Sequence, residues 1–240
     1  GYTPAQLVEA RIYSSAGFPR ITVLDVPFNV LRRHEFDSDL RLVAGAQGEV
    51  HRRYWRQHLD GAPSSLPLAT DYPRPLSPLG PGAARNFIVK GPIVEELKGL
   101  ARAEGTTLFS VLLTAFNVLL HRHSGASDIV IGTPTSGRTR PEFERMVGYL
   151  VNPLPIRTRL RGDEPFQQLV AQIDATIRTS LEHQDYPFPM IVRDVAPPRE
   201  PGRSPIFQIM FGMERFDSAD PRGLAATLLN VAGLAIQYRE

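Results

Sequence analysis

Histidine side chains are the groups in this sequence best suited to proton transfer near neutral pH. His183 precedes Asp185 by two positions, which could make an acid–base pair, and His34 lies in a short polar stretch. His121 and His123 are two positions apart near the end of an expected helix, so they point to different faces and do not predict a metal pair. Structural roles are the alternatives: an architectural helix end for His183, a polar turn for His34, and cations that suit a helix C-terminus for His121 and His123.

Other familiar catalytic patterns are missing from the sequence. There is no G-x-S-x-G, G-x-x-x-x-G-K, G-x-G-x-x-G or H-E-x-x-H pattern. There is also no cysteine, which excludes disulfides, thiolate metal sites and a cysteine nucleophile within this sequence.

Composition is that of a globular protein rich in turns. The 240 residues are 42% apolar and 22% charged, and 19 glycines and 22 prolines predict many loops. A net charge of +2 does not suit a nucleic-acid binder. The longest apolar run, 108–120, contains polar residues and is too short to span a bilayer, and the first residues do not resemble a signal peptide. We therefore expect a cytoplasmic protein without nucleic-acid or membrane partners.

Apolar periodicity predicts the elements that must position any site. Strands are expected at 86–90, 128–132, 154–160 and 205–211, and helices at 92–103, 105–123 and 165–181. The helix at 105–123 is apolar round most of its circumference, so we expect it to be buried. This order predicts an α/β fold with a mixed β-sheet and helices packed on it.

The chain divides into three parts by composition. Residues 1–50 form a lead-in of unknown role, whose short apolar pieces are compatible with strands or with an irregular segment. Residues 51–85 contain an amphipathic helix with the only tryptophan, followed by a linker rich in proline and glycine. Residues 86–240 carry the regular pattern.

A series of motifs runs through this third part in a fixed order. The segments are 107–116, 128–138, 147–157, 183–188 and 203–211. Together they resemble the C-terminal lobe of the condensation domains of nonribosomal peptide synthetases, in the chloramphenicol-acetyltransferase-like superfamily. The resemblance covers roughly residues 54–216.

The resemblance implies a two-lobed enzyme of which this sequence holds one lobe. In the family, a tunnel between the lobes admits a phosphopantetheine arm from each of two carrier proteins, and an HHxxxDG histidine of the N-terminal lobe serves the attacking amine. This sequence has no two adjacent histidines. The stretch most similar to the HHxxxDG pattern, residues 33–37, is one residue too short. The implied partners are an N-terminal condensation lobe, peptidyl carrier proteins and an adjacent adenylation domain. No cofactor is expected to bind directly.

The same resemblance marks a loop across the tunnel floor, formed by Gly132, Thr133, Pro134 and Arg138. The loop follows a buried strand, a place where loops often carry function, although a simple chain-reversing turn is the alternative. The guanidinium of Arg138 could bind a carboxylate or a pantetheine phosphate, or form a structural pair with Glu142 or Glu144.

Further candidates lie on the two later strands. Asn152 matches the family's asparagine near the tunnel, where its amide could orient a substrate carbonyl or satisfy buried backbone. The resemblance also suggests that Gln208 could face the tunnel. Arg157 and Arg159 share one face of a strand with Arg161 and are expected either to be solvated or to contact a phosphate or an acidic carrier protein.

Two other functions stay open at this point. One is a non-catalytic interaction lobe that docks carrier or adenylation domains. The other is a small acyltransferase that uses His34 or His183, with its site completed between subunits. Condensation and heterocyclisation are not distinguished by these motifs.

Overall fold

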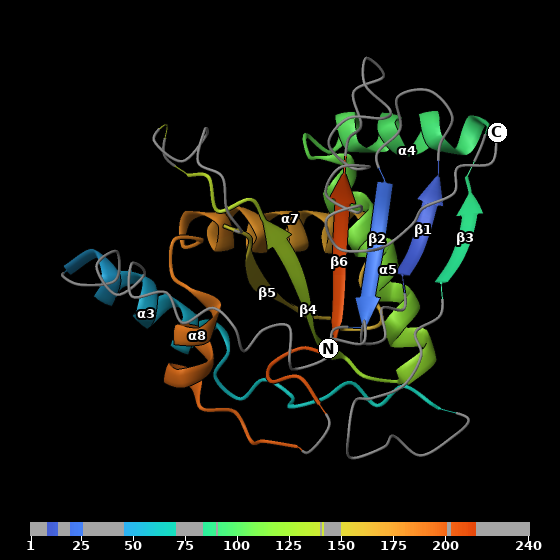
Figure 1. Ribbon diagram of the computed structural model, residues 1–240. Helices are drawn as coiled ribbons and strands as arrows, with labels where there is room; N and C mark the ends of the chain where they lie inside the picture. Colours follow the sequence, from blue (N-terminus) through green and yellow to red (C-terminus); the bar gives the residue numbers. More distant parts are fainter. Residues whose placement is uncertain are drawn as a thin grey trace, which may run out of the picture.

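The computed structural model of the chain describes residues 9–13, 20–25, 46–70, 84–89, 91–139, 141, 150–200 and 203–214. These residues form a six-stranded sheet with helices packed against it (Figure 1). The strands are β1 (Glu9–Tyr13), β2 (Arg20–Asp25), β3 (Ala84–Ile88), β4 (Asp128–Thr135), β5 (Asn152–Arg159) and β6 (Ile209–Glu214). The helices are α3 (Ala46–His58), α4 (Pro92–Ala103), α5 (Leu108–Ser124), α7 (Phe166–Glu182) and α8 (Phe188–Val195).

The sheet is mixed, as the sequence predicts, and its strand order is β3-β1-β2-β6-β4-β5. β1 runs parallel to β3 and antiparallel to β2. β6 joins the two halves of the sheet, antiparallel to β2 and parallel to β4, and β5 closes the far edge antiparallel to β4. The last of the described strands, β6, therefore lies in the middle of the sheet.

Local sequence signals fix the ends of α5. The Thr107 hydroxyl accepts a hydrogen bond from the backbone N–H of Ser110 at 3.1 Å, which is an N-cap. At the other end Gly125 takes a left-handed conformation with φ of 71°, and its N–H donates to the carbonyl of His121. α5 buries Val111, Leu113 and Leu120 but leaves Leu119 about half exposed, so the expectation of a helix covered all round is wrong.

A polar clamp ties α5 to α7. Asp174 of α7 is 9% exposed and accepts hydrogen bonds from the hydroxyls of Thr106 and Ser110, and it pairs with Arg178 at 2.6 Å. Burial alone would raise the pKa of the Asp174 carboxyl, but these hydrogen bonds outweigh it and lower the pKa. The two helices lie together behind the sheet in Figure 1.

Within the first fifty residues the structure contains β1 and β2, and both are strands of the sheet. A further helix, α8, lies where the sequence pattern predicts only a helix end and a loop. Its N-cap is Pro187, a second proline lies in its first turn, and its side chains Phe188 and Ile191 are buried. α3 and α8 pack side by side beyond β4 and β5 (Figure 1).

Among the described residues, no single helix is long and apolar enough to cross a membrane. α4 and α5 meet that criterion only as a pair, and the pair is bent by 108°.

Candidate functional site

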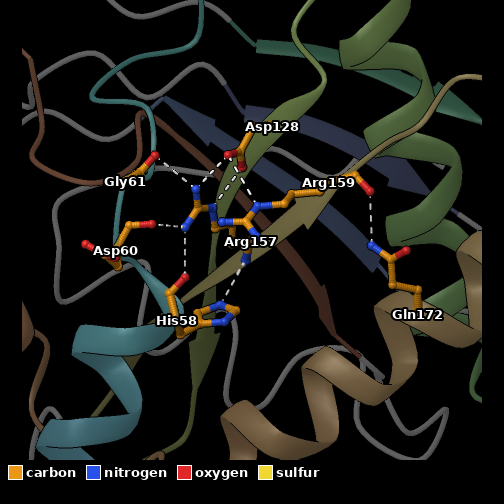
Figure 2. Close-up of polar contacts among 7 residues, drawn as sticks. All are labelled: His58, Asp60, Gly61, Asp128, Arg157, Arg159 and Gln172. Carbon is orange, nitrogen blue, oxygen red and sulfur yellow. Dashed lines mark hydrogen bonds and ion pairs between the residues drawn. The ribbon is translucent and has the colours of Figure 1, made fainter.

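A buried guanidinium holds the segment after α3 against the sheet (Figure 2). Arg157 of β5 makes two hydrogen bonds to the carboxylate of Asp128 on β4, from Nε at 2.9 Å and from Nη2 at 2.6 Å. Its other three N–H groups donate to the backbone carbonyls of His58, Asp60 and Gly61 at 2.6 to 3.0 Å. All five donors of the arginine are thus used.

This arrangement corrects the expectation that Arg157 and Arg159 share an exposed face. The side chain of Arg157 is 4% exposed, whereas that of Arg159 is 67% exposed and lies 3.6 Å from the same Asp128 carboxylate. β5 is buried on both faces from Pro153 to Thr158, because α7 packs on one face and the segment after α3 lies on the other. Of these two arginines, Arg159 is the one whose guanidinium remains accessible to a partner.

His58 completes the arrangement and is kept neutral. Its Nε2 accepts a hydrogen bond from the backbone N–H of Arg157 at 3.3 Å, which requires an unprotonated nitrogen. Burial and the neighbouring charge of Arg157 lower the pKa of His58 to about 4. No separate signal in the sequence points to His58.

Asn152 is engaged entirely by backbone. Its Nδ2 donates to the carbonyls of Gln184 and Tyr186 at 2.8 and 3.0 Å, and its Oδ1 accepts from the N–H of Phe188 at 2.9 Å. These contacts fix the turn between α7 and α8. They match the structural alternative for this asparagine rather than a free amide facing a substrate.

Gln208 plays a similar part at the start of β6. It is 7% exposed, and its Nε2 donates to the carbonyls of Ser64 and Ser204 at 3.0 and 2.9 Å. Its Oε1 accepts from the N–H of Leu66 at 3.1 Å. The side chain thus attaches the segment after α3 to the sheet at a second point.

The structure brings three of the predicted residues round one pair of aromatic rings. The backbone N–H of Phe188 donates a hydrogen bond to Asn152 Oδ1, and the Phe188 ring packs on Phe207 with ring centroids 5.0 Å apart. Phe207 adjoins Gln208 and covers Gly132, where an added Cβ would lie 2.4 Å from its ring. Gly132 is therefore required by packing.

The rest of the predicted floor loop is more open. Thr133 and Pro134 continue β4 opposite Leu154 and Pro153, with Pro134 exposed. Gly137 has φ of 63°, and an added Cβ would meet the carbonyl of Leu150. The backbone N–H of Arg138 donates to the hydroxyl of Ser136 at 3.3 Å. The two carboxylates named as possible partners of Arg138, Glu142 and Glu144, lie outside the described residues.

His183 belongs to an aromatic cluster between α3 and the end of α7. Its Nδ1 lies 2.8 Å from that of His51, its ring stacks on Tyr54 at 4.0 Å between centroids, and its carbonyl accepts from Trp55 Nε1 at 3.1 Å. Burial and then the neighbouring His51 lower its pKa. In the described ranges His183 makes no hydrogen bond to Asp185, so these contacts fit the architectural interpretation of this segment and not the acid–base alternative.

The candidate histidine near the N-terminus cannot be placed. His34 and the stretch 33–37 lie outside the described residues. Over the described ranges, no three histidine, aspartate or glutamate side chains converge as a metal ion would require.

Comparison with known proteins shows which family the chain belongs to. The sequence model of the condensation domain matches residues 40–234, most of the chain. The chain belongs to the condensation domain family.

Most of the relatives considered are peptide synthetases, and the solved structures share its fold. It is 40% identical over 173 residues to one of the subunits of linear gramicidin synthase from Brevibacillus parabrevis, covering 71% of this chain and 3% of that protein. It is 36% identical over 210 residues to phosphinothricin tripeptide synthetase PhsC of Streptomyces viridochromogenes, covering 88% and 19%. A crystal structure of a four-domain nonribosomal peptide synthetase bound to AMP and glycine matches with a TM-score of 0.66 at 31% identity, covering 68% and 12%. The chain thus spans a small part of each of these proteins.

The buried arginine provides a first test. We expect Arg157→Met to lower the free energy of unfolding by about 1–3 kcal/mol, because it leaves three backbone carbonyls and the partly buried carboxylate of Asp128 without their donor. Arg159→Met is the matched control, since it removes an exposed partner of the same Asp128, and it should change stability by no more than about 0.5 kcal/mol. Urea unfolding of both variants measures this, and equal losses would contradict the assignment.

His58 provides a second test, through pH. Its pKa is lowered in the folded state, so the unfolded chain binds more protons between pH 6.5 and 4, and stability is lost as pH falls through that range. The difference amounts to about 3 kcal/mol at most. His58→Gln should flatten the dependence of unfolding free energy on pH between 4 and 6.5 while leaving its slope above pH 7 unchanged. Parallel curves for the two proteins would contradict the buried neutral histidine.

Proposed function

We propose that this chain is the C-terminal lobe of a condensation domain and forms one wall and the floor loop of its tunnel. The observation that carries the proposal is the family match over residues 40–234 together with the absence of adjacent histidines from the 240 residues. The solved first condensation domain of the CDA synthetase shares the fold over 70% of this chain and 36% of that one, with a TM-score of 0.53, so the match takes in only part of that domain.

The reaction of the complete domain would be aminolysis of a thioester. The amine of the acceptor attacks the carbonyl carbon of the donor thioester, a C–N bond forms, the C–S bond breaks, and the donor arm leaves as a thiol. Both substrates would arrive on phosphopantetheine arms of peptidyl carrier proteins, with an adenylation domain next along the synthetase. Tethering makes the encounter effectively intramolecular, which is the main gain such a tunnel offers.

The residues of this chain suit a supporting part in that reaction. Asn152, Gln208 and Arg157 are occupied by internal hydrogen bonds, so they shape the lobe and do not meet substrate. The proton-transferring histidine would come from the N-terminal lobe. Arg159 is the side chain we assign to contact with an acidic carrier surface, because it is the accessible arginine on β5.

A divided active site makes a clear prediction. Incubated with donor and acceptor aminoacyl carrier proteins, this chain should yield no dipeptidyl product alone and should yield product when a separately produced N-terminal lobe is added. The control is the same N-terminal lobe with the second histidine of its HHxxxDG motif changed to alanine, which should abolish product. Mass spectrometry of the carrier-bound species provides the readout.

Other outcomes of this assay would identify other functions. Product from this chain alone would contradict the proposal and point to His34 or His183. No product from the mixture, with carrier binding retained, would favour a non-catalytic docking lobe.

A further inference from the structure

Three histidines take part in the attachment of α3, the helix that lies beside α8 at the outer side of the structure (Figure 1). His51 and His58 belong to α3, and His183 is the C-cap of α7. Trp55, the only tryptophan of the chain, lies on the same helix and is completely buried. A single side chain therefore reports whether α3 is in place.

The first contact is a hydrogen bond between two imidazole rings. The Nδ1 atoms of His51 and His183 lie 2.8 Å apart, and the ring centroids lie 5.0 Å apart. The difference is about twice the radius of an imidazole ring, so each nitrogen points almost directly at the other. Such a bond needs a protonated nitrogen on one side and a bare nitrogen on the other. It is therefore lost when both rings are charged.

Further contacts between α3 and the end of α7 surround this bond. The ring of Tyr54 stacks on that of His183, and the Tyr54 hydroxyl lies 2.9 Å from the hydroxyl of Ser180. Trp55 Nε1 donates to the carbonyl of His183 at 3.1 Å. The middle of α3 thus rests on His183, and two charged imidazoles at this contact would repel each other across the two helices.

The groups around this pair favour a neutral His183. Burial and the neighbouring His51 lower the pKa of His183, and they outweigh the opposing effect of Glu182. Burial raises the pKa of Tyr54, which therefore stays uncharged. Glu49 and Asp194 are paired with arginines. The charged side chains of α3, of α8 and of the turn between α7 and α8 are Glu49, Arg52, Arg53, Arg56, Asp185, Arg193 and Asp194.

The last turn of α3 depends on a neutral histidine as well (Figure 2). His58 Nε2 accepts a hydrogen bond from the backbone N–H of Arg157 at 3.3 Å. A second proton on His58 would replace this acceptor with a donor. It would also put a cation beside the guanidiniums of Arg157 and Arg159, with Asp128 as the opposing charge. Burial and these arginines hold the pKa of His58 at about 4.

The contacts behind the sheet respond differently to acid. Burial would raise the pKa of Asp174 in the clamp between α5 and α7, but its hydrogen bonds and its pairing with Arg178 lower it. The clamp thus stays charged in the range where histidines titrate. β4 and β5 are joined in part by buried side chains that do not titrate, such as Ile131 and Ile156. Acid therefore weakens the attachment of α3 before it weakens the sheet.

We propose that α3 is released by acid: as His51, His58 and His183 become charged, α3 leaves α7 and β5 while the sheet, α5 and α7 stay folded. Groups whose pKa is lowered by folding stabilise the attached state above their ordinary pKa. This contribution is lost as the pH falls through the folded-state values of His58 and His183. Release exposes Trp55 and Leu59 to water. The inference does not depend on the proposed function.

The test follows the fluorescence emission of Trp55 in the full chain as the pH is lowered from neutral. The emission should move to longer wavelength, with a midpoint between pH 6.5 and 4. Over the same range the methyl NMR resonances of Ile131 in β4 and Ile173 in α7, both buried, should remain those of the folded chain. A separate step is expected because the two measurements report different parts of the structure.

Matched variants identify the histidines responsible. Glutamine can hydrogen-bond in place of a neutral imidazole but takes up no proton, so the double variant His58→Gln, His183→Gln should lower the midpoint by about one pH unit. Each single change should lower it by less, which keeps the test decisive if the double variant does not fold. The control His121→Gln, His123→Gln removes two histidines at the end of α5 and should leave the midpoint within about 0.2 pH unit.

Two results would overturn the proposal. An emission that changes only together with the methyl resonances would show that α3 detaches only when the whole chain unfolds. A midpoint that does not move in the His58 and His183 variants, or that moves equally in the control, would assign the transition to other groups. Because the readout is a conformational change in the chain alone, a failure here is separate from a failure of the assay with carrier proteins.

Discussion

The buried pairing of Arg157 with Asp128 is the constraint on which this half of the structure depends. A guanidinium removed from water is costly unless every donor is used, and here a carboxylate and three carbonyls use all five. The three carbonyls belong to the end of α3 and the segment just after it. The charge therefore fixes where α3 ends, how the chain crosses β5, and hence where α8 and the aromatic rings around Gly132 can pack.

Much of the fold follows from the sequence because its signals are local. The period of α7, the Thr107 and Gly125 caps of α5 and the apolar run of β4 are readable without knowing what they pack against. The direction of Arg157 is not readable, since alternation of apolar and charged residues on β5 looks the same whether the second face meets water or another segment. Its partner Asp128 stands opposite Arg159 in the strand register, a cross-strand pairing that only the sheet reveals. α8 escapes prediction because two prolines obscure a short helix that tertiary packing stabilises.

Several of the candidate residues lie near one another, and the contacts that they make are structural. Gly132, Asn152 and Gln208 do gather around Phe188 and Phe207, but they gather as packing and backbone-bonding groups. The residue types of a motif can be required by packing and backbone hydrogen bonds, without any contact with a substrate. If the chain is one lobe of the domain, as we propose, it would contribute geometry and surfaces, and the proton transfer that completes amide formation would come from elsewhere in the condensation domain.

The central structural claim is that Arg157 fastens the segment after α3 to the sheet, and hydrogen exchange tests it most directly. The N–H groups of Ala62, Leu66 and Leu68 are each hydrogen-bonded in that segment. In Arg157→Met they should exchange much faster while amides in the middle of α5 keep their protection relative to global unfolding, and in Arg159→Met neither set should change. Unchanged protection of the segment in Arg157→Met would contradict the claim.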